Sequence, residues 1–174
     1  MLHIYYGDGK GKTTASVGLA LRAIGRYKRT VIAQFLKDKP TGEILALENY
    51  VGEPFITVFR GIGTKKFYHQ MTQTERANTI IQHNKFLSLV LEMIEDNECD
   101  VIILDEVLDA YRFDLIDKDL FTEILNYSKD KEIVLTGHSG VPQALLDEAD
   151  YVTYMECKSH PYKLGIHARE GVEY

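Results

Sequence analysis

The sequence predicts an α/β fold of three layers, in which a mostly parallel sheet of about six strands is covered by helices on both faces. Short apolar segments with strand character alternate with segments of helical periodicity along the whole chain. The aliphatic run at 101–104 is typical of a central strand that is buried on both faces. Parallel strands need crossover connections, which the intervening helices supply. Ligands of such folds bind where the strands end.

The first half of the chain follows this alternation from its first residues. Residues 2–6 form an apolar strand that runs into a glycine-rich loop, and residues 13–27 carry apolar side chains at helical spacing. A capping box of Thr72 and Glu75 then opens a long helix, which we expect to end near Asn97. The elements expected between these two helices are a strand at 30–35, a short helix at 42–50 and a strand at 55–59.

The second half continues the pattern to about residue 155. The expected elements are a strand at 101–104, helices at 106–113 and 117–127, a strand at 133–136, a helix at 142–147 and a strand at 151–155. The tail at 158–174 has no clear period. Because 174 residues suit one domain and no repeat or linker-like stretch interrupts them, we expect a single domain at 1–174.

The composition excludes several classes of protein. The chain is 45% hydrophobic and 26% charged, which is typical of packed globular domains and not of disordered ones. Its net charge of −6 argues against broad attraction to nucleic acid or to anionic membranes. No stretch approaches the roughly 18 apolar residues of a membrane span. The two cysteines form no CxxC pair. We therefore expect a cytoplasmic protein that binds neither nucleic acid nor a membrane.

The strongest functional signal is the loop between the first strand and the first helix. It consists of Gly7, Asp8, Gly9, Lys10, Gly11, Lys12, Thr13 and Thr14. Glycines let backbone N–H groups point at an anion, and the start of the next helix adds its positive dipole end. Lys12 supplies a charge for phosphate oxygens, while the hydroxyl of Thr13 suits Mg²⁺. Tyr6 stands where the usual pattern has its first glycine, so this is a variant phosphate loop. It predicts the P-loop NTPase (RecA-like) architecture.

A second signal is the pair of carboxylates, Asp105 and Glu106, that follows the strand at 101–104. Alone, such a pair can merely cap the next helix. Together with the loop, it predicts acids on the magnesium side of a phosphate site. Asp105 is a candidate either to anchor Thr13 or to hold a metal-bound water, and Glu106 is a candidate to touch the metal. The sequence leaves these two roles open.

Two further residues are candidates by their spacing. Arg22 lies about two helical turns after the loop and can share a face of the first helix with it; a solvated arginine is the alternative. Among the histidines, only His138, in the turn after the strand at 133–136, lies where a ligand contact is expected. The chain has no recognisable Ser-His-Asp or Cys-His signature, so nucleophilic catalysis by the protein has little support.

Several motifs resemble those of the ATP:corrinoid adenosyltransferases of the phosphate-loop type. They are the loop GDGKGKTTAS at 7–16, Arg22, VIAQFLK at 31–37, TGE at 41–43, LDE at 104–106, LTG at 135–137 and the closing stretches at 149–153, 160–161, 165–166 and 171–174. The resemblance spans nearly the whole chain. Many families share the loop motif, whereas this variant together with QFLK and the tail is specific.

The resemblance implies transfer of the adenosyl group of ATP to the cobalt of a reduced corrinoid, with release of triphosphate. It implies that Lys12, Thr13 and Thr14 hold the triphosphate, that Glu106 assists Mg²⁺ and that Arg22 contacts the nucleotide. Co(I) is a strong nucleophile and needs no general base, so Lys12, Thr13 and Glu106 would act by orientation and by stabilising the leaving group. A homodimer and a flavoprotein-type reductase that supplies Co(I) are the partners it implies.

The chain departs from the family pattern at two positions and leaves other functions open. His138 stands where arginine is frequent, and Tyr154 stands in a segment where Thr-Glu-Met is common. Relatives carry aromatic residues, including Trp, under the corrin face; this chain has no Trp, and Phe67 or Tyr68 either substitutes or simply packs. The alternatives are a nucleoside kinase of the same architecture and an ATP-gated interaction module. Type II thymidine kinases need cysteine pairs that this chain lacks.

Overall fold

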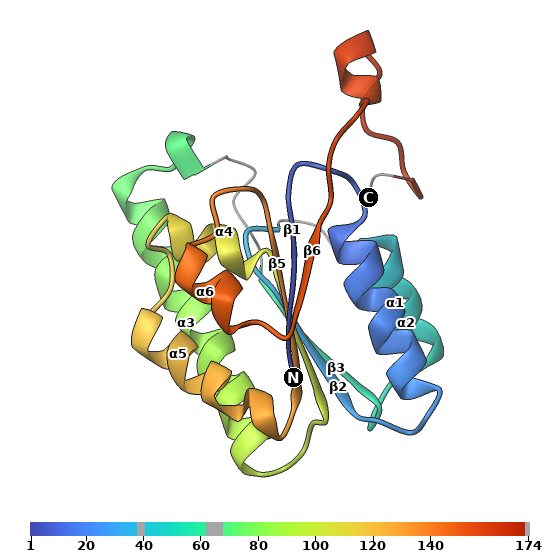
Figure 1. Cartoon of the computed structure of the whole chain (residues 1–174), viewed down its shortest axis with the longest axis vertical. Coiled ribbons are helices and arrows are strands. Elements are labelled where there is room, and N and C mark those ends of the chain that lie inside the picture. Colours follow the sequence, from blue (N-terminus) through green and yellow to red (C-terminus); the bar gives the residue numbers. More distant parts are fainter. Residues whose placement is uncertain (38–40, 62–67, 173–174) are drawn as a thin grey trace.

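The computed structural model describes residues 1–37, 41–61 and 68–172 (Figure 1). Within these residues, six strands form one parallel sheet in the order β3-β2-β4-β5-β1-β6. The strands are β1 (Leu2–Tyr6), β2 (Thr30–Gln34), β3 (Ile56–Arg60), β4 (Val101–Asp105), β5 (Glu132–Gly137) and β6 (Tyr151–Tyr154). The expected α/β sheet is confirmed. β5 separates β1, which leads into the glycine loop, from β4, which ends at Asp105.

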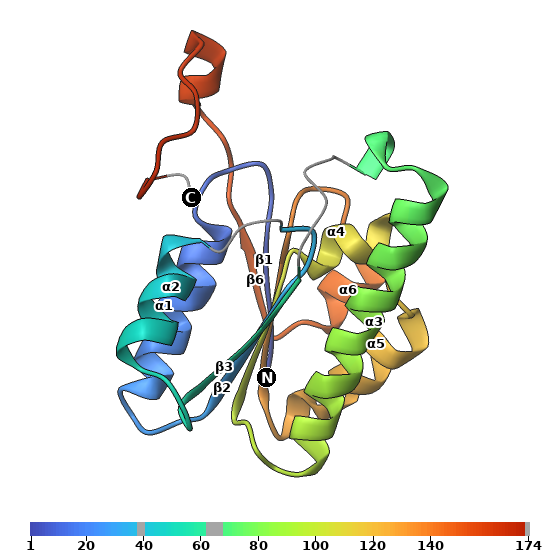
Figure 2. The ribbon, with the colours of Figure 1, turned by 180° about the vertical axis from the view of Figure 1, so that it is seen from behind.

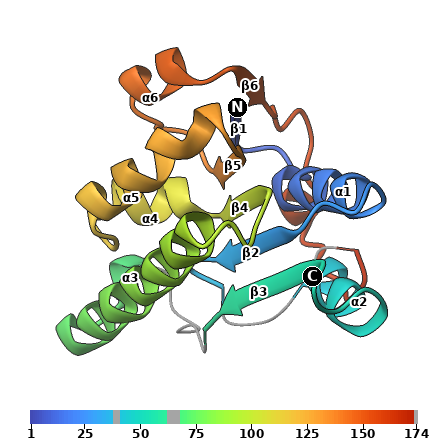
Figure 3. The ribbon, with the colours of Figure 1, turned by 90° about the horizontal axis from the view of Figure 1, so that it is seen from below.

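Helices cover both faces of the sheet, as Figure 3 shows. The helices are α1 (Lys12–Ile24), α2 (Gly42–Tyr50), α3 (Gln73–Glu95), α4 (Val107–Arg112), α5 (Lys118–Leu125) and α6 (Gln143–Glu148). α1 and α2 lie on one face, and α3 to α6 lie on the other. No helix in the described part of the chain is long and apolar enough to cross a membrane.

The alternation of side chains along β4 explains why the core has two halves. Ile103 points to the face of α1 and α2, where it joins Val17 and Ile44 in one buried cluster. Ile102 and Leu104 point to the opposite face and join the larger cluster under α3 to α6. Successive side chains of a strand point to opposite faces, so an uninterrupted aliphatic run is required where both faces are covered.

The expected elements agree with the structure except at a few boundaries. The first helix ends at Ile24 and not at residue 27, because Gly25 caps it and Tyr27 takes a left-handed backbone with φ 62°. Glu106 is also left-handed, with φ 63°, so α4 begins only at Val107. The capping box is confirmed: the N–H of Thr72 donates to Glu75, and the N–H of Glu75 donates to the hydroxyl of Thr72.

The chain beyond β6 returns to the carboxyl edge of the sheet. Figures 1 and 2 show this segment rising past the start of α1. It contains one short 3₁₀ helix, Pro161–Leu164, and then brings Gly171 and Val172 beside the glycine loop. The backbone oxygen of Val172 accepts a hydrogen bond from Lys10. The tail therefore contributes to the edge where ligands of such sheets bind.

Candidate phosphate and metal site

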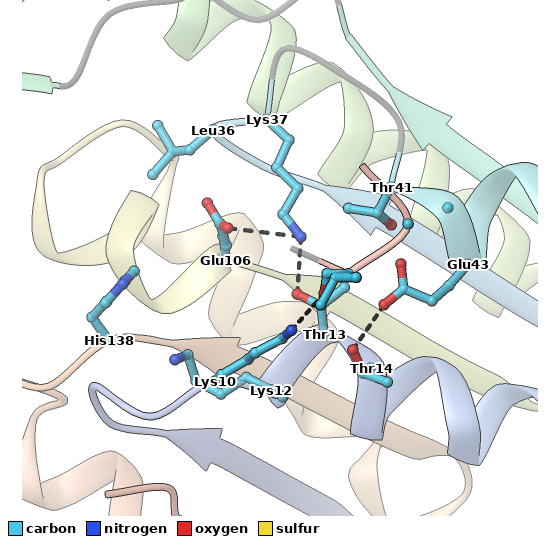
Figure 4. Close-up of a pocket in the computed structure, with 14 residues that line it drawn as sticks. Lys10, Lys12, Thr13, Thr14, Leu36, Lys37, Thr41, Glu43, Glu106 and His138 are labelled. Atoms are coloured by element: carbon cyan, nitrogen blue, oxygen red, sulfur yellow. Dashed lines mark hydrogen bonds and ion pairs between the residues drawn. The ribbon is translucent and has the colours of Figure 1, made fainter. Parts of the chain in front are cut away.

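A cleft of about 750 Å³ lies at the carboxyl edge of the sheet (Figure 4). Five segments far apart in the sequence line it. The lining residues are Lys10, Gly11, Lys12, Thr13, Thr14, Leu36, Lys37, Thr41, Gly42, Glu43, Glu106, His138, Gly171 and Val172. The loop and Glu106 are predicted to share one phosphate site, and His138 is predicted to lie where a ligand contact is expected. The structure brings them together at this cleft.

Two glycines of the loop, Gly7 and Gly9, are required by close backbone contacts. A Cβ at Gly7 would lie 2.4 Å from the backbone oxygen of Met155, and one at Gly9 would lie 2.7 Å from the same atom. The N–H of Gly9 donates to that oxygen at 2.7 Å. Gly11 has φ 110° and is the N-cap of α1, so the helix starts within the loop and its first turn lines the cleft. A helix start of this kind favours an anion.

Lys12 folds back across its own loop. Its ammonium donates to the backbone oxygens of Gly7 and Gly9, each at 2.7 Å. Burial lowers the pKa of Lys12, whereas the carboxylates around the cleft oppose that shift. Because carbonyl oxygens carry only partial charge, a phosphate is a stronger partner for this ammonium than its present contacts. Lys12 is therefore in position to take up an anion that enters the loop.

Asp105 joins three elements at the end of β4. It is only 1% exposed. Its Oδ1 accepts from the hydroxyl of Thr13 at 2.9 Å and from that of Thr136 at 2.8 Å. Its Oδ2 accepts from the amide of Gln34 at 3.1 Å and from the ammonium of Lys37. Of the two roles that the sequence left open, the geometry matches the anchoring of Thr13.

Glu106 turns into the cleft from its left-handed position. Its N–H donates to Thr136 at 2.8 Å, and its Oε1 lies 3.7 Å from the ammonium of Lys37. Burial raises the pKa of Glu106 to about 7, although the charge of Lys37 opposes the shift. A cation that binds beside this carboxyl group would favour its charged form.

Lys37 is the main site residue that sequence reasoning missed. Its ammonium donates to Thr13 Oγ1 at 2.9 Å and also contacts both carboxylates. Burial lowers the pKa of Lys37, but the charges of Asp105 and Glu106 outweigh that effect and raise it overall. The sequence signal for Lys37 is the segment QFLK, because this segment lies at the end of a strand whose carboxyl end faces the cleft. Glu43 was missed as well; it accepts from the hydroxyl of Thr14 at 2.8 Å.

His138 forms a hydrogen-bonded pair with Asp109 on the opposite wall of the cleft. Both its backbone N–H and its Nδ1 donate to Asp109 Oδ2, at 2.7 and 3.0 Å. The hydrogen bond that His138 donates to Asp109 raises the pKa of His138, and burial opposes this. Asp109 Oδ1 accepts from Arg112 at 2.9 Å. A ligand contact by His138 stays a prediction.

Arg22 does not reach this cleft. It lies ten residues after Lys12, which is about 15 Å along a helix axis. Its side chain is exposed and lines a separate groove with Asp100 and Asp130. The spacing describes the direction of Arg22 around α1 but not its distance from the loop, and a contact of Arg22 with the nucleotide stays a prediction.

The aromatic residues singled out in the sequence differ in what the structure shows of them. Phe67 lies outside the described residues. Tyr68 stacks on Phe113 with ring centres 4.3 Å apart, and the guanidinium of Arg76 lies 4.5 Å from the ring centre of Tyr68. Tyr154 packs beside Tyr6, with ring centres 5.1 Å apart. Packing therefore accounts for the positions of Tyr68 and Tyr154.

The oxygens around Lys37 fit a magnesium ion that is shared with phosphates. Mg²⁺ prefers oxygen ligands, and Thr13 and Glu106 offer a hydroxyl and a carboxylate. The cluster already holds a cation, the ammonium of Lys37. Among the residues that the structure describes, no three His, Cys, Asp or Glu side chains gather into a metal site of their own. Mg²⁺ commonly enters such sites with substrate phosphates rather than alone.

The chain is similar over its whole length to proteins of one family. Residues 1–174 match the family model described as ATP:corrinoid adenosyltransferase BtuR/CobO/CobP. A corrinoid adenosyltransferase of Sinorhizobium sp. is 33% identical over 176 residues, which cover 97% of this chain and 77% of that protein. Corrinoid adenosyltransferase CobA of Salmonella typhimurium (strain LT2) is 30% identical over 172 residues, which cover 98% of this chain and 84% of that protein. The same coverage at 29% identity holds for the corrinoid adenosyltransferase of Escherichia coli K12. This chain belongs to the ATP:corrinoid adenosyltransferase family.

Proposed function

We propose that this chain transfers the 5′-deoxyadenosyl group of ATP to the Co(I) of a reduced corrinoid and releases triphosphate. The observation that carries this proposal is the meeting of Lys12, Thr13 and Glu106 at one cleft in a chain of this family. In the reaction, the electron pair of Co(I) forms the bond to the ribose C5′. The bond from C5′ to the phosphate oxygen breaks, and its electrons leave with triphosphate.

The residues of the cleft match the needs of such a leaving group. Lys12 and the first turn of α1 supply positive charge for the phosphate oxygens. Thr13 and Glu106 would hold Mg²⁺, which neutralises phosphate charge when it is bound. The nucleophile carries no proton, so no side chain has to act as a general base. Preorganised electrostatic stabilisation of this type contributes strongly to catalysis.

Several finer expectations accompany this function. Residues 1–174 act as one domain, which the single sheet with its two covering layers supports. The substrates are ATP and a corrinoid, with Mg²⁺ as cofactor. The protein works in the cytoplasm as a homodimer and receives Co(I) corrinoid from a flavoprotein-type reductase. These statements are predictions that separate experiments have to test.

Analysis of the products tests the function directly. The enzyme is incubated with Mg·ATP and a chemically reduced corrinoid, and chromatography and ³¹P NMR follow the products. Intact triphosphate in equal amount to adenosylcorrinoid is the expected result. ADP with a phosphorylated acceptor would identify a kinase instead. Slow hydrolysis of ATP, or no reaction, would favour an ATP-gated interaction module. Lys85→Ala, on the exposed side of α3, is the matched control for variants of the cleft lysines.

A further inference from the structure

The ammonium of Lys37 lies where a metal ion would meet the protein. It donates to Thr13 Oγ1 at 2.9 Å, contacts Asp105 Oδ2 and lies 3.7 Å from Glu106 Oε1. Figure 4 shows it between Glu106 and Thr13. Its side chain is 14% exposed, so solvent screens these charges only in part. Thr13, Asp105 and Glu106, the three residues expected at the metal, thus all contact a cation of the chain itself.

The fold holds Lys37 in this place through the residue before it. Leu36 has a left-handed backbone, φ 56°, which turns the chain at the end of β2. Its N–H donates to Nε2 of the buried His83 at 3.3 Å, and Nδ1 of His83 donates to the backbone oxygen of Leu115 at 3.1 Å. A positive φ is uncommon for a residue other than glycine and persists only where its surroundings stabilise it. The approach of Lys37 to the carboxylates is therefore built into the fold.

Lys37 and a metal ion cannot use these oxygens together. The hydroxyl of Thr13 donates its proton to Asp105, and it accepts from Lys37 on the side that remains. A divalent ion bound to Thr13 and Glu106 would also repel an ammonium at hydrogen-bond distance. The lysine side chain is flexible and Lys37 lines the cleft, so its ammonium can move towards bound phosphate.

We propose that Lys37 is a built-in cation that holds Thr13, Asp105 and Glu106 together in the nucleotide-free enzyme and leaves Thr13 and Glu106 when Mg²⁺ enters with ATP. The inference rests on the proposed function, because ATP is the ligand that brings Mg²⁺ into the site. Lys37 acts as a positioning residue: it keeps the ligands in place and discourages free Mg²⁺ from binding before the nucleotide. After its displacement it adds a positive charge to the phosphate side of the cleft.

The test is the thermal stability of the nucleotide-free protein with and without Mg²⁺. In EDTA, Lys37→Met should lower the Tm by about 5 °C or more, because the buried carboxylates lose their cation. Magnesium chloride at about 10 mM should raise the Tm of this variant by roughly 3 °C or more, since the metal replaces the lost charge. The Tm of the wild type should not respond. Lys85→Met is the matched control, and NaCl at equal ionic strength excludes general screening.

A second variant covers the case in which Lys37→Met does not fold. The double variant Lys37→Met/Glu106→Gln removes the excess negative charge and should recover most of the Tm. If Lys37 stabilised the protein only by packing, Glu106→Gln would not restore the Tm that Lys37→Met lowers. The proposal is overturned if Mg²⁺ raises the Tm of the wild type as much as that of Lys37→Met, or if neither variant shows the expected behaviour. No corrinoid or ATP enters these measurements, so their failure is distinct from a failure of adenosyl transfer.

Discussion

The hydroxyl of Thr13 donates a hydrogen bond of 2.9 Å to Oδ1 of Asp105, across 92 positions of sequence. Thr13 lies in the first turn of α1, after strand β1, whereas Asp105 ends β4, and β5 lies between these strands. Thr136 on β5 donates to the same oxygen. The phosphate loop is thereby tied to the acid of β4 through a buried carboxylate. The first turn of α1 therefore cannot shift without breaking the hydrogen bond between Thr13 and the buried Asp105.

Lys12→Ala should abolish adenosyl transfer. Lys12 lies within the loop and is the cation best placed to follow phosphate into it. We expect a loss of at least about 100-fold in kcat/KM, in the range found when one stabilising group for a developing charge is removed. Calorimetric titration with Mg·ATP should show a matching loss of affinity. Turnover at the wild-type rate would remove Lys12 from the site.

Glu106→Gln should raise the magnesium requirement of the reaction. The amide keeps the shape of the side chain but loses the charge that a divalent ion prefers. The half-saturating Mg²⁺ concentration should increase by about tenfold or more, which corresponds to roughly 1.4 kcal/mol of metal binding. Initial rates over a Mg²⁺ series measure it, with Glu95→Gln on the exposed end of α3 as control. Identical titration curves would exclude Glu106 from metal binding.

Stability should fall as the pH drops through the range in which His83 titrates. Burial lowers the pKa of His83 from 6.5 to about 4. Between about pH 6.5 and 4, His83 is therefore protonated in the unfolded chain but neutral in the folded chain. The free energy of unfolding decreases as the pH falls through this range. The expected loss from this group is about 2 kcal/mol between pH 7 and about pH 5. Denaturant unfolding of the wild type and of His83→Gln at both pH values measures the difference.

The matched control for this experiment is His167→Gln, which changes an exposed histidine in the tail. It should keep the pH dependence of the wild type, whereas His83→Gln should lose the part that His83 contributes. Equal pH dependence in all three proteins would contradict a neutral, buried His83.

Asp109→Asn should lower the pKa of His138. The hydrogen bond that the imidazole donates to Asp109 is the main cause that raises this pKa above 6.5, and the charge of Asp109 adds to it. An NMR titration of the imidazole protons should therefore show a midpoint that moves to lower pH in the variant. The resonance of exposed His167 serves as an internal reference. An unchanged midpoint for His138 would mean that the pair is not formed in solution.

Regular elements could be predicted because their signals are periodic and local. The capping box of Thr72 and Glu75 was correct, and so were the bounds of the helix at 42–50. The predicted helix at 13–27 is too long at its C-terminal end, because the apolar spacing continues past Gly25, where the helix stops. Arg22 illustrates what periodicity reports: it gives the face of α1 on which this side chain lies, whereas the distance from the cleft follows from its position along the helix.

The sequence by itself determined the α/β architecture, the phosphate loop and its acidic partners, because each depends on residues that are neighbours in the chain or repeat with a fixed period. Only the tertiary structure decided that Lys37 completes the site. Its position depends on the left-handed turn at Leu36 and on the contact of that turn with His83, 47 positions away. Contacts between distant segments arise when strands and helices pack into one core, and a linear pattern contains no measure of them.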